Sequence, residues 1–180
     1  MTSPWLVAID LQRIFAEPPS PWAAAGFDAA AEGVERLLPA FAERTVFTRY
    51  VAPAEPRGAW VDYFAIWPFA RVPANDPMYE IVPRFARAAR RVETRETFGK
   101  WDAGLLAAVD GAEEIVLAGV ATDCCVIATA LAAADAGVRV RIPADACTGA
   151  SRADHERALT AMALFAPLVE ITTVAGILAG

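Results

Sequence analysis

Short apolar runs and segments of helical periodicity alternate along this chain. The apolar runs lie at residues 5–9, 45–48, 91–93, 114–118, 138–142 and 168–171. The helical segments lie at residues 27–43, 101–109, 127–137 and 151–165. This alternation indicates βαβ units, because parallel strands need a crossover connection that a helix usually supplies. The sequence therefore predicts one α/β domain over residues 1–180, a doubly wound, Rossmann-like parallel sheet of about six strands flanked by helices.

Composition and charge narrow the class of protein. The chain has 180 residues, 56% of them hydrophobic, so one domain can bury a sizeable core. A formal net charge of −6 disfavours a nucleic-acid-binding surface. No run is long and apolar enough to span a bilayer, and residues 1–10 lack the basic start of a secretory signal. With three cysteines that make no disulfide framework, we expect a cytoplasmic protein that binds neither membrane nor nucleic acid.

Residues 51–83 interrupt the alternation. The segment is rich in proline, tryptophan and phenylalanine and has no clear periodicity. It follows the second predicted strand, at the edge where doubly wound sheets bind ligands, so we expect it to form the wall of a pocket. The alternative is an arm that packs over the core or on another subunit, which does not exclude the first role. A basic run comes next and is predicted to be a solvated helix face: Arg84, Arg87, Arg90, Arg91 and Arg95.

A cysteine stands at a predicted strand–turn–helix junction. The strand 114–118 ends at Gly119, and Cys125 opens the alanine-rich helix that follows. In the first turn of a helix, free backbone N–H groups and the positive end of the helix dipole favour a thiolate and can hold an oxyanion. We expect Thr122 or Asp123 to cap this helix. Cys125 is therefore a candidate nucleophile.

Histidine is scarce in this chain. The one histidine, His155, lies in a polar segment that is typical of the exposed first turns of a helix. This disfavours Ser/His and Cys/His mechanisms, as well as zinc sites built on several histidines or on paired Cys-x-x-Cys motifs. Any general base must then be a carboxylate, and any cationic partner a lysine or arginine. We expect no metal ion and no cofactor, and we expect Cys124 and Cys147 to pack as small apolar side chains.

Two charged residues follow predicted strands at the same edge of the sheet. Asp10 ends the first strand after an apolar run, where a carboxylate needs a partner or a chemical role. Lys100 follows the third strand between aromatic residues, and its side chain is not expected to belong to the core. Because the carboxyl ends of parallel strands share one edge, Asp10, Lys100 and Cys125 are expected to converge as base, cation and nucleophile.

At this point the sequence resembles the isochorismatase-like cysteine hydrolases along nearly its whole length. The matching pieces are Asp10-x-Gln12-x-x-Phe15, Lys100, Gly119-Val120-Ala121-Thr122-Asp123-x-Cys125-Val126 with Thr129, and Asp145-Ala146-Cys147. The resemblance implies that Asp10, Lys100 and Cys125 form a catalytic triad. It also implies a cis peptide between Val120 and Ala121, which would direct backbone N–H groups towards the substrate oxygen.

Departures from the family pattern narrow the expected reaction. Metal-dependent nicotinamidases of this superfamily carry an aspartate and histidines after the second strand, where this chain reads Thr48-Arg49-Tyr50-Val51-Ala52-Pro53. That branch is disfavoured, and the segment that begins at Trp101 also departs from the family pattern. An intact triad points to hydrolysis of a C–N bond. The alternatives are an isochorismatase-type vinyl ether hydrolase and, more distantly, a non-enzymatic thiol redox sensor or binding module that uses Cys124 and Cys125.

The expected mechanism is acyl transfer through a thioester on Cys125. Asp10 acts as general base and then acid, Lys100 holds its charge, and the N–H groups of Ala121 and Cys125 stabilise the oxyanion. The substrate is a small molecule, and the Pro-rich segment together with family resemblance implies a homodimer or larger oligomer. Candidate substrate-binding residues are Gln12, Phe15, Tyr50, Trp60, Trp67, Phe98 and Trp101.

Overall fold

A computed structural model describes residues 3–180 and contains one seven-stranded parallel sheet. Met1 and Thr2, at the start of the predicted domain, lie outside this range. The strands are β1 (Trp5–Ile9), β2 (Thr45–Tyr50), β3 (Val92–Arg95), β4 (Glu114–Val120), β5 (Arg139–Pro143), β6 (Cys147–Thr148) and β7 (Val169–Thr172). Their order is β3-β2-β1-β4-β5-β7, and the short β6 pairs with the end of β4. The predicted α/β fold with a parallel sheet is therefore confirmed.

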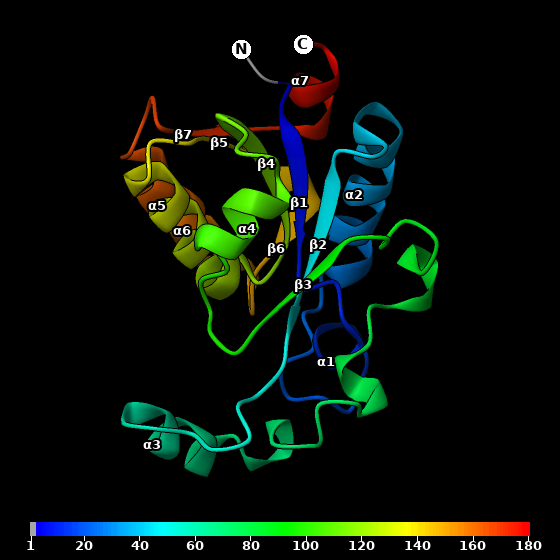
Figure 1. The fold of residues 1–180 in the computed structure, drawn as a ribbon, viewed down its shortest axis with the longest axis vertical. Coiled ribbons are helices and arrows are strands. Elements are labelled where there is room, and N and C mark those ends of the chain that lie inside the picture. The colour runs from blue at the N-terminus through cyan, green and yellow to red at the C-terminus, as the bar shows by residue number, and fades with distance from the viewer. Residues whose placement is uncertain (1–2) are drawn as a thin grey trace.

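Helices cover both faces of the sheet. The α-helices of the described residues are α1 (Arg13–Ala16), α2 (Phe27–Phe41), α3 (Ala59–Ile66), α4 (Ala103–Ala108), α5 (Ile127–Asp135), α6 (Arg152–Ala163) and α7 (Val174–Leu178). Helix α2 lies on one side of the sheet, and α4, α5 and α6 lie on the other (Figure 1). This division follows from right-handed crossovers that run in opposite directions from the central strands. Within residues 3–180, no helix combines the length and apolar character needed to cross a bilayer.

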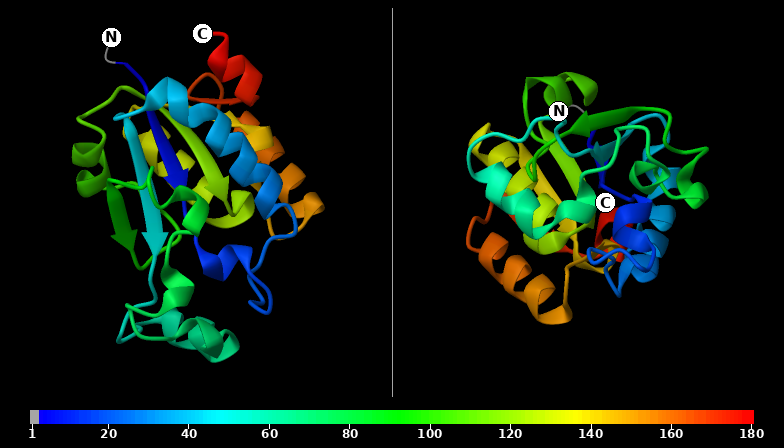
Figure 2. Two further views of the ribbon diagram at one scale, coloured as in Figure 1. Left: turned by 90° about the vertical axis from the view of Figure 1, so that its right-hand side faces the viewer. Right: turned by 90° about the horizontal axis from the view of Figure 1, so that it is seen from below.

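The strand order reverses direction between β1 and β4, the two central strands. Both strands are almost wholly buried, as expected for a parallel sheet covered on both faces. Their carboxyl ends point towards α1 and α3, at the end of the molecule opposite α7 (Figures 1 and 2). This is the topological switch point, where sheets of this kind bind ligands.

Gly119 allows the ends of β1 and β4 to lie unusually close. Its φ is +116°, a conformation that side chains rarely adopt, and it pairs with Ile9 across the two strands. A Cβ atom at this position would lie 2.2 Å from the carbonyl oxygen of Ile9. Only glycine fits, so this residue brings the turn after β4 next to Asp10.

Several elements differ from the sequence-based expectations. Helix α3 and three short 3₁₀ turns (Pro68–Ala70, Pro77–Tyr79 and Pro83–Phe85) occupy or border the segment 51–83, which showed no periodicity. The reason is that α3 presents aromatic rings to a cavity and apolar side chains to solvent, so it has no single apolar stripe. Strand β6 has two residues, too few for a periodic signal.

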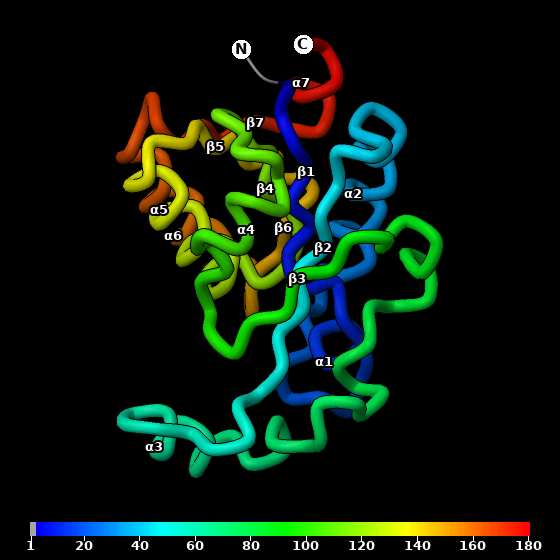
Figure 3. The backbone as a smooth tube through the Cα atoms, viewed as in Figure 1, coloured from blue at the N-terminus to red at the C-terminus, as the bar shows by residue number. Residues whose placement is uncertain are grey.

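The basic run after residue 83 is not a helix face, so that prediction is wrong. Beyond the turn Pro83–Phe85 the chain forms turns and enters β3. Arg84 pairs with Glu35 at 2.6 Å, Arg90 with Glu43 at 2.7 Å and Arg95 with Asp102 at 2.7 Å. These ion pairs link the loops to neighbouring elements, and the spacing of the arginines in the sequence does not reveal the pairing. The tube in Figure 3 shows this irregular course between α3 and β3.

Candidate active site

Asp10, Lys100 and Cys125 come together at the carboxyl edge of the sheet. Asp10 follows β1, Lys100 lies between β3 and α4, and Cys125 lies in a π-helical turn (η4, Thr122–Val126) between β4 and α5. Lys100 Nζ lies 2.9 Å from Asp10 Oδ2, with both side chains fully buried. After burial, the negative charge of Asp10 is the next cause that raises the pKa of the Cys125 thiol, so the two side chains lie close together. The carboxylate is thus beside both the cation and the thiol.

The Asp10 side chain is held by its neighbour on β2. Thr48 donates its hydroxyl hydrogen to Asp10 Oδ1 at 2.7 Å and accepts from the Asp10 backbone N–H at 3.2 Å. Asp10 has φ +48°, a left-handed conformation that aspartate tolerates better than most residues. Among residues 3–180, Oδ2 has no hydrogen-bond donor, so its contact with Lys100 is an ion pair without hydrogen-bond geometry. Thr48 is a site residue that sequence reasoning missed.

Lys100 belongs to the core, contrary to expectation. It is among the largest fully buried side chains of the chain. Its Nζ donates to the Thr97 carbonyl at 2.7 Å and lies 5.4 Å from the centre of the Tyr50 ring. Its backbone N–H donates to the Thr129 hydroxyl at 3.0 Å, and that hydroxyl donates to the Cys125 carbonyl at 2.6 Å. Thr129 therefore links the lysine loop to the cysteine turn.

The turn that carries Cys125 begins with a cis peptide bond between Val120 and Ala121. The Ala121 carbonyl accepts from the backbone N–H groups of Cys124 and Val126, both at 3.1 Å. Val120, Ala121 and Cys125, the three residues expected at the oxyanion site, all line one cavity.

The predicted helix cap at Thr122 or Asp123 is wrong. Ala121 occupies the capping position, and no side chain caps the turn. The Asp123 carboxylate instead accepts from the backbone N–H of Ala150 at 3.0 Å. The Thr122 hydroxyl lies 2.8 Å from His155 Nδ1. His155 is therefore half-buried rather than exposed, and it connects α6 to the cysteine turn.

The pKa of the Cys125 thiol is raised well above its usual value, so the expected resting thiolate is wrong. Complete burial is the main cause, because a charged thiolate would lose its hydration. The negative charge of Asp10 raises the pKa further, and the Lys100 ammonium lowers it only in part. The resting site therefore pairs a protonated thiol with a carboxylate that can accept the proton.

We expect iodoacetamide to alkylate Cys125 about tenfold or more faster than Cys147, because Cys125 lines a cavity beside a base. Burial raises the pKa of Cys147 to about 12, and its thiol contacts the Leu117 carbonyl at 3.8 Å. Because the pKa of Cys125 is also raised, its alkylation rate should show no step near about pH 8.5, where free thiols ionise. Peptide mapping by mass spectrometry measures both rates. Preferential labelling of Cys147 would contradict the assignment of Cys125 as the reactive thiol.

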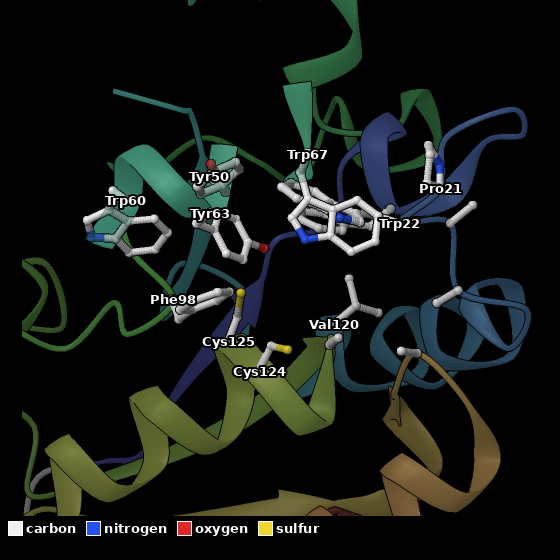
Figure 4. Close-up of a pocket in the computed structure, with 15 residues that line it drawn as sticks. Pro21, Trp22, Tyr50, Trp60, Tyr63, Trp67, Phe98, Val120, Cys124 and Cys125 are labelled. Carbon is white, nitrogen blue, oxygen red and sulfur yellow. The ribbon is translucent and has the colours of Figure 1, made fainter. Parts of the chain in front are cut away.

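The cavity above Cys125 has a volume of about 260 Å³. Figure 4 shows Phe98 and Tyr63 near Cys125, with Trp67 and Trp22 farther from the thiol in this view. Five of the expected substrate-binding residues line it: Phe15, Tyr50, Trp60, Trp67 and Phe98. Trp22 and Tyr63 also line it and were missed by sequence reasoning, since an aromatic residue in a loop or short helix is indistinguishable there from a core residue.

Two expected contact residues, Gln12 and Trp101, are not among the lining residues. Gln12 is fully buried, and its amide donates to the carbonyls of Tyr50 at 2.8 Å and Tyr79 at 2.7 Å. It also accepts from the Tyr50 backbone N–H at 2.7 Å. Gln12 therefore fixes the segment that carries Tyr50, and Trp101 packs against the core.

The described part of the chain offers no ligand set for a metal ion. Across residues 3–180, no three histidine, cysteine, aspartate or glutamate side chains are grouped so that they could hold one. The residues at the end of β2 are Thr48, Arg49 and Tyr50, and none of these is a usual zinc ligand.

Solved structures with the same fold include several hydrolases. A cysteine hydrolase from Pseudomonas syringae pv. phaseolicola 1448A superposes with a TM-score of 0.85 at 18% identity, covering 97% of this chain and 90% of its own. An isochorismatase-like hydrolase from Alkaliphilus metalliredigens has a TM-score of 0.81 at 16% identity, covering 99% and 98%. The pyrazinamidase of Pyrococcus horikoshii in complex with zinc has a TM-score of 0.73 at 24% identity, covering 96% and 99%.

Sequence comparison assigns the family. None of the curated proteins searched matches the chain. The family model described as the isochorismatase domain matches residues 4–175, which include β1 to β7 and every member of the Asp10, Lys100 and Cys125 cluster. The chain therefore belongs to the isochorismatase family.

Proposed function

We propose that this protein hydrolyses a C–N bond of a small carboxamide through a thioester on Cys125. The observation that carries the proposal is the position of the Asp10 carboxylate, which lies beside the Lys100 ammonium and the Cys125 thiol beneath an aromatic cavity. A buried carboxylate next to a protonated thiol is a general base next to a nucleophile. The family membership supports a hydrolase.

In the proposed acylation step, Asp10 takes the thiol proton as the Cys125 sulfur attacks the amide carbon. The C=O electron pair moves to oxygen, and the N–H groups of Ala121 and Cys125 stabilise this oxyanion, each contributing about 3 kcal/mol. The C–N bond then breaks, and the nitrogen leaves as ammonia or an amine with the proton that Asp10 returns.

In the deacylation step, water attacks the thioester carbon. Asp10 accepts a proton from this water and passes it to the departing sulfur, which restores the thiol and releases a carboxylic acid. Lys100 keeps the charge of Asp10 compensated throughout, because an isolated buried carboxylate would favour its neutral form.

The cavity disfavours vinyl ether hydrolysis of isochorismate. That substrate carries two carboxylates, and each would need a cation or several donors in a dry site. No arginine or lysine of residues 3–180 lines this cavity. A sensor role for Cys124 and Cys125 is also disfavoured, since burial raises the pKa of Cys124 to about 11 and also raises that of Cys125, which lowers spontaneous reactivity towards oxidants.

Ammonia release from a panel of small amides, carbamoyl compounds and lactams tests the proposal. We expect at least one uncharged carboxamide to give equal amounts of ammonia and carboxylic acid. Hydrolysis of isochorismate with no turnover of any amide would contradict the proposal and favour the vinyl ether reaction.

We expect chelation to leave activity unchanged, because the cluster of Asp10, Lys100 and Cys125 supplies base, cation and nucleophile without a metal ligand set. The residues after β2 do not fit the zinc that accompanies the Pyrococcus relative. The measurement is amide turnover before and after dialysis against EDTA. Loss of turnover that zinc or manganese restores would show that the triad is incomplete as described.

A further inference from the structure

The wall of the active-site cavity carries no charged side chain. Its lining among residues 3–180 consists of aromatic, alanine, proline, valine and cysteine residues. Asp10 and Lys100 lie beneath it, fully buried, and they compensate each other at 2.9 Å. Neither charge is therefore free to pair with a charged group on a ligand in the cavity.

Aromatic rings from four separate segments form one connected layer around the cavity. Trp22, in the loop between α1 and α2, stacks on Phe15 with ring centres 6.0 Å apart and planes 7° apart. Its ring centre also lies 6.0 Å from that of Trp67, which follows α3, and 6.1 Å from that of Tyr63. The layer continues through Phe98, whose ring centre lies 5.3 Å from that of Trp60 and 5.6 Å from that of Tyr63. Figure 4 shows Cys125 beside these rings.

This arrangement opposes a negative charge on the ligand. A carboxylate that enters such a cavity loses hydration, and no lysine or arginine lines the wall to replace it. The faces of aromatic rings also carry the negative part of their quadrupole, which repels an anion placed over them. A flat apolar group, by contrast, gains contact with the aromatic rings that line the cavity. The cavity of about 260 Å³ is large enough for one ring and its amide.

We propose that the substrate is an uncharged carboxamide with a flat apolar acyl group, and that the aromatic walls around Trp22 and Trp67 exclude anionic analogues. This inference rests on the proposed function, since it concerns the same cavity and nucleophile.

The first test compares para-methylbenzamide with para-carboxybenzamide. The carboxylate has three heavy atoms and the methyl group one, so para-isopropylbenzamide, which matches the carboxylate in heavy-atom count without its charge, is measured beside them. None of these substituents strongly deactivates the amide carbonyl, so a lower rate for the anion than for both neutral compounds reports its exclusion. We expect kcat/KM to be at least about 100-fold higher for the methyl compound. Equal values, or a preference for the carboxylate, would overturn the inference.

A charge introduced into the wall should reverse this preference. Trp67→Arg places a cation opposite Cys125, and Trp67→Leu removes the same ring without adding charge. We expect the ratio of kcat/KM for para-carboxybenzamide over para-methylbenzamide to rise about tenfold or more in Trp67→Arg relative to Trp67→Leu. Equal ratios in the two folded variants would contradict the inference that the cavity excludes anions because it lacks a cation.

A second readout separates this inference from the proposed function. Iodoacetamide carries a neutral amide, and iodoacetate carries an anionic carboxylate of similar size. For each reagent, the alkylation rate of Cys125 is divided by the alkylation rate of free cysteine. We expect this normalised ratio to favour iodoacetamide by about tenfold or more. Selective alkylation without turnover of any amide would support the cavity inference and refute the proposed function. Amide turnover with no discrimination by charge would support the proposed function and refute the cavity inference.

Discussion

Replacing Cys125 by alanine is expected to lower amide turnover by about 10³-fold or more, because it removes the thiol that lies beside the Asp10 base. The variant should keep its fold, since the thiol is small and alanine fits the same turn. Steady-state ammonia release on the amide identified in the panel measures the effect. Residual activity near that of the wild type would show that Asp10 acts without the thiol, as an acid-catalysed vinyl ether hydrolase could.

Cys147→Ala is the matched control for the loss of a buried thiol. Cys147 lies in β6, is as buried as Cys125 and is not among the residues that line the cavity. We expect its turnover to stay within about threefold of wild type and its stability to fall by about 1 kcal/mol. A loss of activity equal to that of Cys125→Ala would mean that the first variant fails for structural reasons.

Replacing Lys100 by alanine is expected to affect both stability and activity. The substitution leaves the Asp10 carboxylate buried without its cation, which costs about 3–5 kcal/mol of unfolding free energy. It also removes the cation that lies beside the proposed base, so turnover should fall by about 10²-fold or more. Denaturant unfolding and ammonia release measure the two effects.

A double variant separates the two roles of this pair. In Asp10→Asn/Lys100→Met both charges are absent, so most of the stability lost in Lys100→Ala should return. Activity should not return, because the base is gone. A double variant as unstable as Lys100→Ala would show that the destabilisation comes from lost packing, and an active double variant would contradict the triad.

The sequence allowed much of the fold to be predicted, because its central strands are buried on both faces. The runs that became β1 and β4 are almost entirely apolar, and polar residues come soon after them at the edge where chemistry is expected: Asp10 directly follows β1, and Thr122 comes two residues after β4. For the same reason the convergence of Asp10, Lys100 and Cys125 followed from their positions after three strands of one sheet.

What the sequence could not predict depends on burial and on contacts between distant segments. The pKa of Cys125 is raised by complete burial and by the charge of Asp10, whereas a local view of the helix start predicts the opposite. Thr48 holds Asp10 from a neighbouring strand, 38 positions away in the sequence. Trp22 and Tyr63 join the cavity only because loops far apart in the chain fold over the same strand ends.

The proposed hydrolysis depends on acylation of Cys125. An activated aryl ester, made from an acid whose amide is a substrate, acylates faster than the thioester is hydrolysed, so the intermediate accumulates. Rapid acid quench followed by peptide mass spectrometry should then find the acyl group on the peptide that contains Cys125, together with a burst of the phenol. Steady turnover with no adduct on that peptide, or with the same burst in Cys125→Ala, would contradict the thioester mechanism.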